Sequence, residues 1–283
     1  MSNLLIIYTG GTIGMVPGPD GLTPGEGVLE RALEARLPSA TKAEILRFDP
    51  LVDSANVGPA DWNRMLDLIE DWSGSGVIIV HGTDTMAYTG AALSSALTDV
   101  RFPVVLCGSM VPLEQGGDAE ANLDLAVSAV AGKAGVWLAF AGKVMPAAGL
   151  VKHDSHAADA FRSHPQTPFA VRSRRFDEQK RLAVVTLTPG LSARAVAAML
   201  SELDGAVLRV FGAGTMMANP ELEAVLHKAV GRGCHIRAVS QCEAGGLEPA
   251  AYAAGAAIWQ VGVENGGAET PELALARLWL SLS

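Results

Sequence analysis

The stretch Thr9-Gly10-Gly11-Thr12-Ile13-Gly14 follows directly on the apolar run Leu4–Tyr8. Such a short apolar run predicts a buried strand rather than a buried helix. The glycines after it let the backbone turn tightly and come close to a small ligand. In open parallel sheets, ligands collect beyond the carboxyl ends of the strands. Thr12 therefore lies where such a sheet does its chemistry, although on its own the stretch is more readily interpreted as a plain turn with a structural threonine.

A second stretch repeats this construction. The apolar segment Val77–Val80 predicts another buried strand, and it ends in His81-Gly82-Thr83-Asp84-Thr85-Met86. Asp84 adds a carboxylate that can bind an ammonium group or orient a proton donor. Threonines at the ends of two strands suggest a nucleophile and the group that activates it.

A threonine hydroxyl is a weak nucleophile and needs a neighbouring base. A lysine can supply that base where burial or other cations favour its neutral form. Lys152 is the best candidate, because it follows the strand-like Gly135–Phe140 and the apolar Met145–Val151. The sequence does not show that the lysine and the threonines meet.

Strand-like and helix-like segments alternate along the whole chain, which predicts an α/β fold. We expect a larger N-terminal domain, with a mostly parallel sheet and helices on both faces, and a smaller C-terminal α/β domain. The boundary is placed at the polar stretch Arg172–Arg181, which gives domains at 1–175 and 182–283 with a linker at 176–181. The segments expected to form strands are Leu4–Tyr8, Ile45–Phe48, Val77–Val80, Pro103–Cys107, Gly135–Phe140, Leu182–Leu187, Ala206–Phe211 and His235–Ser240.

Helix signals lie between these strands. Val28, Leu29, Ala32 and Leu33 recur at helical spacing, and Asp61 is expected to cap a helix that Gly74-Ser75-Gly76 ends. Further helices are expected from near Asp118, over Ser192–Leu203 and Pro220–Val230, and from Thr270-Pro271-Glu272. The glycine- and proline-rich segment Met15–Gly27 is expected to be a loop.

Composition narrows the class of protein. The formal net charge is -9 and the basic residues form no dense cluster, which argues against a nucleic-acid surface. Three cysteines, Cys107, Cys234 and Cys242, do not form a disulfide framework, so a reducing compartment is expected. The longest apolar stretch, roughly 125–151, is broken by lysines, a proline and glycines, so it is not a membrane span. With no secretory signal at the start of the sequence, we expect a cytoplasmic protein.

The two threonine motifs together carry a resemblance. TGGTIG at 9–14 with HGTDTM at 81–86 resembles the bacterial-type L-asparaginase/glutaminase family, most closely its cytoplasmic type I branch. The pair at this spacing is far more specific than either motif alone. Counterparts of further family segments are DSANVGPADW at 53–62, GSMVPL at 108–113, LVKHDSHAADAF at 150–161, SQCEAGG at 240–246 and ETPELALARL at 269–278. The resemblance therefore covers nearly the whole chain.

The resemblance implies roles for four residues. Thr12 would be the nucleophile that attacks the side-chain amide carbon, giving a β-aspartyl ester and releasing ammonia. Thr83, Asp84 and Lys152 would move protons and activate the attacking group. Family members differ in how the two threonines share the work, so Thr83 is the second candidate for the nucleophile.

The resemblance also implies how substrate is held. Asp84 would bind the substrate ammonium with Thr83 beside it, and Ser54, with Asp53 and Ala55, would hold the α-carboxylate, partly through backbone N–H groups. Ser109, in the GSMVPL segment, is a further expected substrate-binding residue. The segment Met15–Gly27 would be a lid that closes over substrate.

This chain departs from the family pattern in four respects. Leu22 stands where the family lid usually carries a tyrosine, and Thr215 where an asparagine that reaches a neighbouring active site is common. Ala55 stands where some members have a glutamine that contacts the substrate amine. The chain is also shorter than typical members. We expect these departures to affect rate and substrate preference more than fold.

We accordingly expect an L-asparagine amidohydrolase that produces L-aspartate and ammonia, without metal or organic cofactor, as a homodimer or homotetramer. L-Glutamine is a further possible substrate; nucleic acid and membranes are not expected partners. The alternatives are an amidohydrolase or ammonia-supplying subunit with another amide substrate, and a non-catalytic amino-acid-binding relative.

Other motifs admit simpler interpretations. His153, His156 and His164, with Asp154 and Asp159, match no strong metal signature and are interpreted as surface or capping residues. Cys242 is interpreted as a buried structural thiol rather than a reactive one. The glycines at 10–14 lack the spacing of a dinucleotide-binding fingerprint, which disfavours a nicotinamide site. Trp62 and Trp72 are expected to pack in the core.

Overall fold

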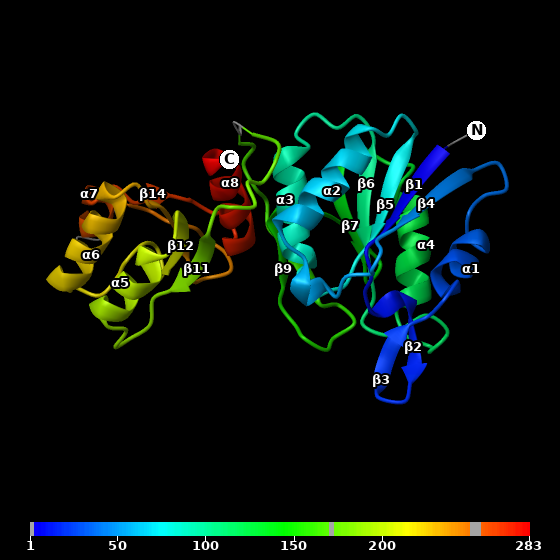
Figure 1. Ribbon diagram of the computed structural model, residues 1–283, viewed down its shortest axis with the longest axis horizontal. Helices are drawn as coiled ribbons and strands as arrows, with labels where there is room; N and C mark the ends of the chain where they lie inside the picture. Colours follow the sequence, from blue (N-terminus) through cyan, green and yellow to red (C-terminus); the bar gives the residue numbers. More distant parts are fainter. Residues whose placement is uncertain (1–2, 170–172, 250–255) are drawn as a thin grey trace. The chain divides into compact units, whose positions relative to one another are not determined.

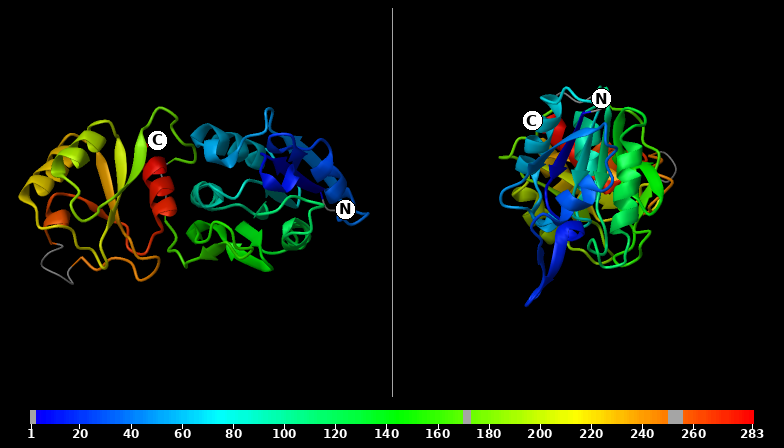
Figure 2. Two further views of the ribbon diagram at one scale, coloured as in Figure 1. Left: turned by 90° about the horizontal axis from the view of Figure 1, so that it is seen from below. Right: turned by 90° about the vertical axis from the view of Figure 1, so that its right-hand side faces the viewer.

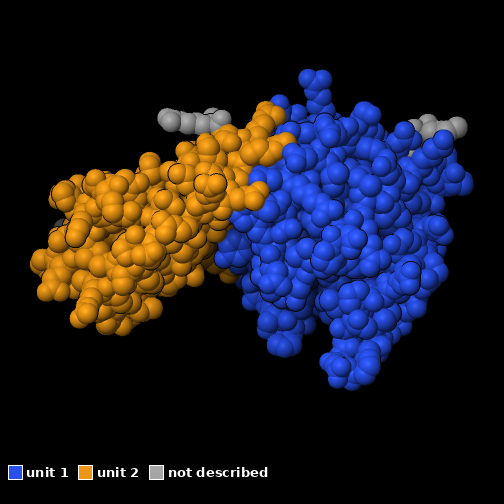
Figure 3. Space-filling view, viewed as in Figure 1, with its two compact units in different colours: residues 1–165 blue, residues 166–283 orange. Residues whose placement is uncertain are grey.

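The computed structural model describes residues 3–169, 173–249 and 256–283. The chain forms two compact units, residues 1–165 and 166–283 (Figure 3). The stretch 176–181, which we expected to link two domains, lies inside the second of these units. The boundary between independently folding domains therefore stays a prediction.

The first unit is built on one mixed sheet with the strand order β4-β1-β5-β6-β7-β8 (Figure 1). Its strands are β1 (Asn3–Tyr8), β4 (Lys42–Arg47), β5 (Gly76–Val80), β6 (Pro103–Cys107), β7 (Gly135–Phe140) and β8 (Lys143–Pro146). Neighbouring strands run parallel, except β8, which pairs antiparallel with β7. The predicted mostly parallel sheet is confirmed.

Helices cover both faces of this sheet because its strands are apolar on both sides. Leu4, Ile6 and Tyr8 of β1 pack in one core cluster with α1 (Val28–Glu34) and α4 (Ala119–Ala129). The alternate residues of β1 are also buried and face the opposite side. That side is covered by α2 (Pro59–Glu70) and α3 (Met86–Ala96) (Figure 1).

Two local expectations for this unit were wrong. Helix α2 is capped by Gly58 and not by Asp61; Pro59 takes the first helical position, and the Asp61 carboxylate accepts a hydrogen bond from the Gly58 N–H at 3.0 Å. A proline suits that position because it has no N–H to satisfy. The segment Met15–Gly27 is not a plain loop: it contains an antiparallel hairpin.

This hairpin consists of β2 (Met15–Gly18) and β3 (Gly21–Pro24) and projects from the rest of its unit (Figure 1 and Figure 2). Leu22 on β3 pairs with Pro17 and is 51% exposed. At the other end of the unit's chain, β9 (Leu150–Lys152) pairs antiparallel with β10 (Phe161–Ser163) after the short helical turn η3 (Ala147–Gly149). Lys152 is thus the last residue of a strand.

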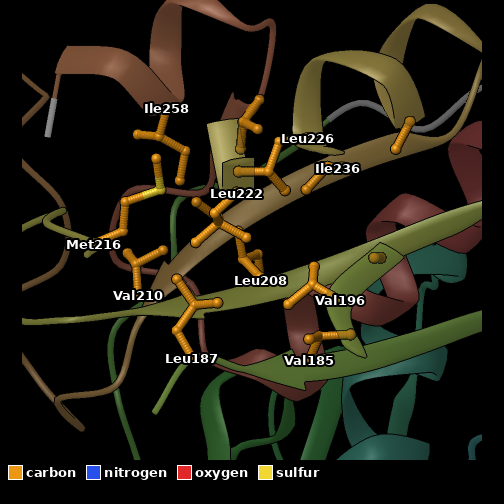
Figure 4. Packing of buried hydrophobic residues seen from close by; sticks show 14 of the residues in the cluster. Val185, Leu187, Val196, Leu208, Val210, Met216, Leu222, Leu226, Ile236 and Ile258 are labelled. Carbon is orange, nitrogen blue, oxygen red and sulfur yellow. The ribbon is translucent and has the colours of Figure 1, made fainter. Parts of the chain in front are cut away.

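The second unit has its own sheet and core. Parallel strands run in the order β11 (Leu182–Thr186), β12 (Gly205–Val210), β13 (His235–Ser240) and β14 (Glu264–Asn265). Apolar side chains of α5 (Ala193–Ser201), α6 (Pro220–Gly231) and α7 (Ala256–Gln260) pack on one face (Figure 4). Helix α8 (Pro271–Leu282), capped by Thr270 as predicted, packs on the other face. The predicted smaller C-terminal α/β domain is confirmed.

Within the described ranges, no helix is both long and apolar enough to cross a membrane. All three cysteines are free: Cys107 and Cys234 are buried, whereas Cys242 is exposed. The interpretation of Cys242 as a buried structural thiol was therefore wrong. Burial, reinforced by the nearby Asp118 carboxylate, raises the pKa of Cys107 to about 12, which keeps its thiol protonated and unreactive.

Candidate active site

The site lies where the sheet order reverses. The chain runs from β1 to β4 on one side and then to β5 on the other side of β1. After β5 the chain continues to β6, away from β4, so the connections after the neighbouring strands β1 and β5 diverge and a crevice forms beyond the carboxyl ends of these two strands. Three segments enter it: residues 9–14 after β1, the turn η2 (Ser54–Asn56) after β4, and residues 81–86 after β5.

Glycines bring these three segments into contact. A Cβ on Gly11 would lie 2.6 Å from the Gly82 nitrogen, and a Cβ on Gly82 would lie 2.5 Å from the Ser54 Oγ. Gly11 also has φ 104°, in the region that favours glycine. The two glycines are thus needed for the segments to approach so closely.

The segments enclose a pocket of about 280 Å³, small enough to suit a compact ligand. Of the expected site residues, the structure brings six to its wall: Thr12, Thr83, Asp84, Lys152, Asp53 and Ser54. Gly11, Met15, Gly82, Met110 and Ser155 complete the lining.

Lys152 contacts two other polar residues of this pocket. Its Nζ donates hydrogen bonds to Asp84 Oδ1 at 2.7 Å and to Thr83 Oγ1 at 3.0 Å. The lysine side chain is 17% exposed, whereas the aspartate side chain is 65% exposed. A charge-assisted contact of this length is among the stronger hydrogen bonds in proteins. The sequence left open whether these residues meet, and the structure places them in direct contact.

Thr12 is presented by a short 3-10 turn, η1 (Thr12–Gly14), and is half-buried. The turn is closed by the Gly14 N–H, which donates to the Gly11 carbonyl at 3.3 Å. Before the glycines, the buried Thr9 is tied to β5, since its N–H and its hydroxyl both donate to the Val80 carbonyl. Thr12 therefore sits on a backbone fixed at both ends.

Ser54 belongs to a second fixed turn. The Asp53 carboxylate accepts a hydrogen bond from the Ala55 N–H at 3.1 Å and so caps η2. The Thr85 hydroxyl donates to the Ser54 carbonyl at 2.6 Å, which joins this turn to the segment after β5. Ser54 itself is buried against Gly82.

The pocket has more carboxylates than cations. Its described lining residues include two carboxylates, those of Asp53 and Asp84, and one ammonium, that of Lys152. Lys152 is paired with Asp84, so the pocket keeps an excess negative charge. This charge favours a ligand that carries an ammonium group of its own.

Two expected substrate-binding residues lie elsewhere. Ser109 is buried and turns its hydroxyl into its own loop, donating to the Val111 carbonyl at 2.6 Å. Ala55 is exposed, and neither residue is among the described residues that line the pocket. Met110, the residue after Ser109, lines the pocket instead. The sequence alone does not show which of these two adjacent residues lies in the pocket wall.

The loop that carries Met110 is held by Asp118, the N-terminal cap of α4. The Asp118 carboxylate accepts hydrogen bonds from the N–H groups of Met110 and Val111, both at 2.9 Å, and from the Asn122 side chain at 3.0 Å. Asn122 Nδ2 also donates to the Gly108 carbonyl at 3.0 Å. The predicted helix start near Asp118 is confirmed, and its cap also shapes one wall of the pocket.

Sequence reasoning missed Met15, Met110 and Ser155 as lining residues. Ser155 lies three positions after Lys152 within the LVKHDSHAADAF segment, so that segment was the available signal. The Ser155 Oγ lies 2.7 Å from His156 Nδ1 at the rim of the pocket. Met15 begins the segment expected to be a lid and Met110 lies in the GSMVPL segment, but neither methionine was singled out within its segment.

Side chains of the histidine-rich segment near the pocket, residues 153–159, make contacts with nearby backbone and side chains. Asp154 accepts hydrogen bonds from the N–H groups of His156 and Ala157, both at 2.8 Å, and these bonds lower the pKa of its carboxyl. Asp159 pairs with Lys143 at 2.6 Å. In the part of the chain that the structure describes, no group of three or more His, Cys, Asp or Glu side chains could hold a metal ion.

Comparison with known proteins covers the whole chain. Residues 3–181 match the family described as "Asparaginase, N-terminal", and residues 181–283 match the "Glutaminase/Asparaginase C-terminal domain". L-asparaginase 1 of Escherichia coli K12 is 31% identical over 312 residues, covering 99% of this chain and 92% of the relative.

Solved structures agree with these matches. The thermostable L-asparaginase of Thermococcus kodakarensis superimposes with a TM-score of 0.86 at 29% identity, covering 99% of this chain and 92% of that one. L-asparaginase I of Vibrio cholerae superimposes with a TM-score of 0.84 at 32% identity, with the same coverage of both chains.

Relatives with other names also match. The human 60 kDa lysophospholipase is 31% identical over 97% of this chain and 56% of its own length. A glutamyl-tRNA(Gln) amidotransferase component of Thermoplasma acidophilum is 27% identical over 95% of this chain and 70% of its own length. With both family models matched from residue 3 to residue 283, and a pocket that holds paired threonines, aspartate and lysine, the chain belongs to the asparaginase family.

Proposed function

We propose that this protein hydrolyses L-asparagine to L-aspartate and ammonia. The observation that carries the proposal is the contact of Lys152 Nζ with both Thr83 Oγ1 and Asp84 Oδ1, in a pocket that Thr12 also lines. A pocket that merely binds an amino acid needs no such proton-transfer chain. The E. coli, Thermococcus and Vibrio relatives, all named as L-asparaginases, support the same substrate.

In the proposed first step, Thr12 Oγ attacks the side-chain amide carbon of the substrate. The proton of its hydroxyl passes through the Thr83–Lys152 pair to the leaving nitrogen as the C–N bond breaks and ammonia departs. A β-aspartyl ester on Thr12 remains. Water then attacks the ester carbon, its proton returns to the Thr12 oxygen, and L-aspartate is released.

The proposed mode of substrate binding follows from the charges of the pocket. The substrate ammonium lies against the exposed carboxylate of Asp84, with Asp53 adding to the negative potential. The α-carboxylate lies at Ser54, which lines the pocket beside Gly82. In this arrangement the side-chain amide of the substrate reaches the two threonines.

A second candidate is the hydrolysis of another amide, with the released ammonia passed to a partner enzyme. The match to an amidotransferase component favours it. It predicts weak turnover of free L-asparagine and L-glutamine. It also predicts that the same Thr12 and Lys152 are needed for the reaction.

The test is ammonia release from L-asparagine and L-glutamine by the wild type, Thr12→Ala and Thr83→Val. We expect turnover of L-asparagine by the wild type and losses of about 10²-fold or more in both variants. Robust activity of Thr12→Ala would overturn the assignment of the nucleophile. If the wild type is inactive on both amides, the proposal that L-asparagine is the substrate is wrong. Trapping of the acyl-enzyme, with the modified threonine located by mass spectrometry, separates Thr12 from Thr83.

We further propose a homodimer or homotetramer in the cytoplasm, in keeping with the family resemblance of the sequence. Light scattering coupled to gel filtration measures the mass of the assembly. A monomer at micromolar concentration would contradict this proposal without affecting the proposed reaction.

A further inference from the structure

A buried polar chain runs behind the pocket. The Trp62 indole N–H donates to the Thr89 Oγ1 at 3.1 Å, the Thr89 hydroxyl lies 3.0 Å from His81 Nε2, and His81 Nδ1 lies 2.6 Å from the Gly82 carbonyl oxygen. His81 and Thr89 are completely buried, and Trp62 is 5% exposed. This series of hydrogen bonds joins α2, α3 and the end of β5, the elements from which two walls of the pocket extend.

The contacts define the state of the imidazole. A carbonyl oxygen can only accept a hydrogen bond, so His81 Nδ1 carries a hydrogen and donates it to Gly82. Nε2 then accepts from the Thr89 hydroxyl, whose oxygen in turn accepts from Trp62. With a neutral imidazole, the Trp62 N–H, the Thr89 hydroxyl and both ring nitrogens of His81 each have a hydrogen-bond partner. Burial also lowers the pKa of His81, which agrees with this neutral tautomer.

The bond to Gly82 determines which way the next peptide faces. In a trans peptide, the carbonyl and the following N–H point in opposite directions. With the Gly82 carbonyl directed at the buried ring, the Thr83 N–H points away from the ring, and both Gly82 and Thr83 line the pocket. The Thr83 side chain, which contacts Lys152, is carried by the same backbone.

We propose that His81 is a positioning residue for the reaction: through Nδ1 it holds the Gly82–Thr83 peptide so that Thr83 faces the pocket and meets Lys152. Thr89 supports this role by fixing the ring through Nε2. The inference rests on the proposed amide hydrolysis for its kinetic consequences. It does not place His81 in contact with substrate.

Two substitutions of His81 distinguish the roles of its two ring nitrogens. In His81→Asn the side-chain amide can take the place of Nδ1 and keep the donor to Gly82, whereas in His81→Gln it takes the place of Nε2 and keeps only the contact with Thr89. We expect kcat to fall about tenfold or more in His81→Gln and to stay within about twofold in His81→Asn. The KM for L-asparagine should change less than kcat, because Asp84 and Ser54, which are proposed to hold the charged groups of the substrate, are not substituted. Equal losses of kcat in the two variants, or none in either, would overturn the proposal.

Variants of α3 distinguish positioning from a loss of stability. Thr89→Val removes the hydroxyl that fixes the ring and should lower kcat, and Thr89→Ser should restore it. Ser95→Ala removes another buried hydroxyl of the same helix, one that donates to the Ala91 carbonyl. It should lower the melting temperature without changing kcat. A fall of kcat in Ser95→Ala as large as that in Thr89→Val would contradict the positioning role.

A further measurement does not depend on activity. The ¹⁵N chemical shifts of the His81 ring at pH 7, in protein labelled at histidine, should show a neutral imidazole with hydrogen on Nδ1. A ring with hydrogen on Nε2, or a charged ring, would overturn the inference even in an active enzyme. A wild type that is inactive on L-asparagine but has the Nδ1–H ring would instead contradict the proposed function and leave the orientation of the peptide supported.

Discussion

The contacts that define this pocket are made by single residues that lie far apart in the chain. Lys152 contacts Asp84 and Thr83 across 68 and 69 positions, and the backbones of Gly11 and Gly82 touch. Each contact depends on one or two atoms. Conservative substitutions at these positions should therefore have large and separable effects.

Lys152→Met should abolish the proposed ammonia release while the protein stays folded. The change keeps the aliphatic chain but removes the Nζ that links Asp84 and Thr83, so we expect kcat to fall about 10²- to 10⁴-fold. Lys143→Met is the matched control, because Lys143 also pairs with an aspartate, at 2.6 Å, but with both side chains more than half exposed. Kinetics and melting temperature are measured for both variants. Comparable kcat values in the two would refute the role of Lys152.

Gly11→Ala should damage the pocket through the backbone. A Cβ would meet the Gly82 backbone at 2.6 Å, and φ 104° is unfavourable for alanine. We expect a loss of about 1–3 kcal/mol in the free energy of unfolding together with loss of activity. In Gly231→Ala, at the end of α6, the new Cβ would meet nothing within 4 Å, so stability should be unchanged or slightly raised. Urea unfolding compares the two; equal stabilities would contradict the close contact.

His81 should make stability depend on pH in a defined direction. Its folded pKa is lowered below the ordinary value of 6.5, mainly by burial, although the hydrogen bond to the Gly82 carbonyl and the Asp61 carboxylate oppose the shift. The unfolded chain therefore binds the proton more readily than the folded one. The stabilising effect is complete above about pH 6.5 and is lost as the pH falls through that value toward the folded pKa.

The size of this effect is measured against a variant that does not titrate. Between pH 7.5 and 5.5, His81 should contribute a loss of at most about 1.4 kcal/mol to the free energy of unfolding. His81→Asn should lose correspondingly less over the same range. Identical pH dependence in wild type and variant would show that the ring titrates alike in the folded and unfolded chains.

At the scale of elements, the hairpin β2–β3 differs most from its sequence-based prediction. Glycines and prolines predicted a loop, but Met15–Gly18 and Gly21–Pro24 pair in register. Leu22 exposes an apolar side chain there. The hairpin begins directly after the turn that presents Thr12, and Met15 lines the pocket. This position fits the lid that we proposed for the segment.

Leu22→Ser should separate lid function from stability. Since the side chain is 51% exposed, the free energy of unfolding should change by less than about 0.5 kcal/mol. If the hairpin closes over substrate, KM for L-asparagine should rise severalfold through loss of an apolar contact. Met199→Ser, at another exposed apolar side chain on α5, should change neither quantity. An unchanged KM in Leu22→Ser would show that this residue takes no part in closure.

At the scale of the molecule, each unit has its own sheet and apolar core. The second unit also contains a buried ionic cluster. Arg277 Nη1 pairs with Glu269 at 2.7 Å, Nη2 donates to the Thr167 carbonyl at 2.6 Å, and the guanidinium carbon lies 5.1 Å from the centre of the Phe169 ring. Arg277 thereby fastens the first residues of this unit to α8.

Arg277→Met should destabilise the protein by about 3 kcal/mol, because it leaves the Glu269 charge without its closest partner in a site where both side chains are more than 90% buried. Arg181→Met removes exposed ion pairs with Glu202 and Asp204 and should lower stability by less than about 1 kcal/mol. Urea unfolding followed by tryptophan fluorescence measures both. A smaller loss in Arg277→Met than in Arg181→Met would contradict the structural role of the cluster.

The sequence by itself determined the order of elements and the residues proposed to carry the chemistry. Buried strands, helix caps such as Thr270, and the paired motifs at Thr12 and Thr83 are local patterns, since their periodicity and turn chemistry involve neighbours within a few positions. For that reason the α/β class, the two sheets and the candidates Thr12, Thr83 and Asp84 could be predicted, whereas Asp53 and Ser54 were expected only from the family resemblance. The prediction that Asp61 caps α2 was wrong, because the helix begins at Pro59 and its cap is Gly58, three positions before Asp61.

Only the tertiary structure decided which of these residues meet. The contact of Lys152 with Thr83, the choice of Met110 over Ser109 for the pocket wall, the exposure of Cys242 and the burial of His81 all depend on segments distant in the chain. Such contacts follow from strand order and from close approach at Gly11 and Gly82, and no local period encodes them. The physical reason is that a side chain's direction relative to a distant segment is a property of the packed sheet.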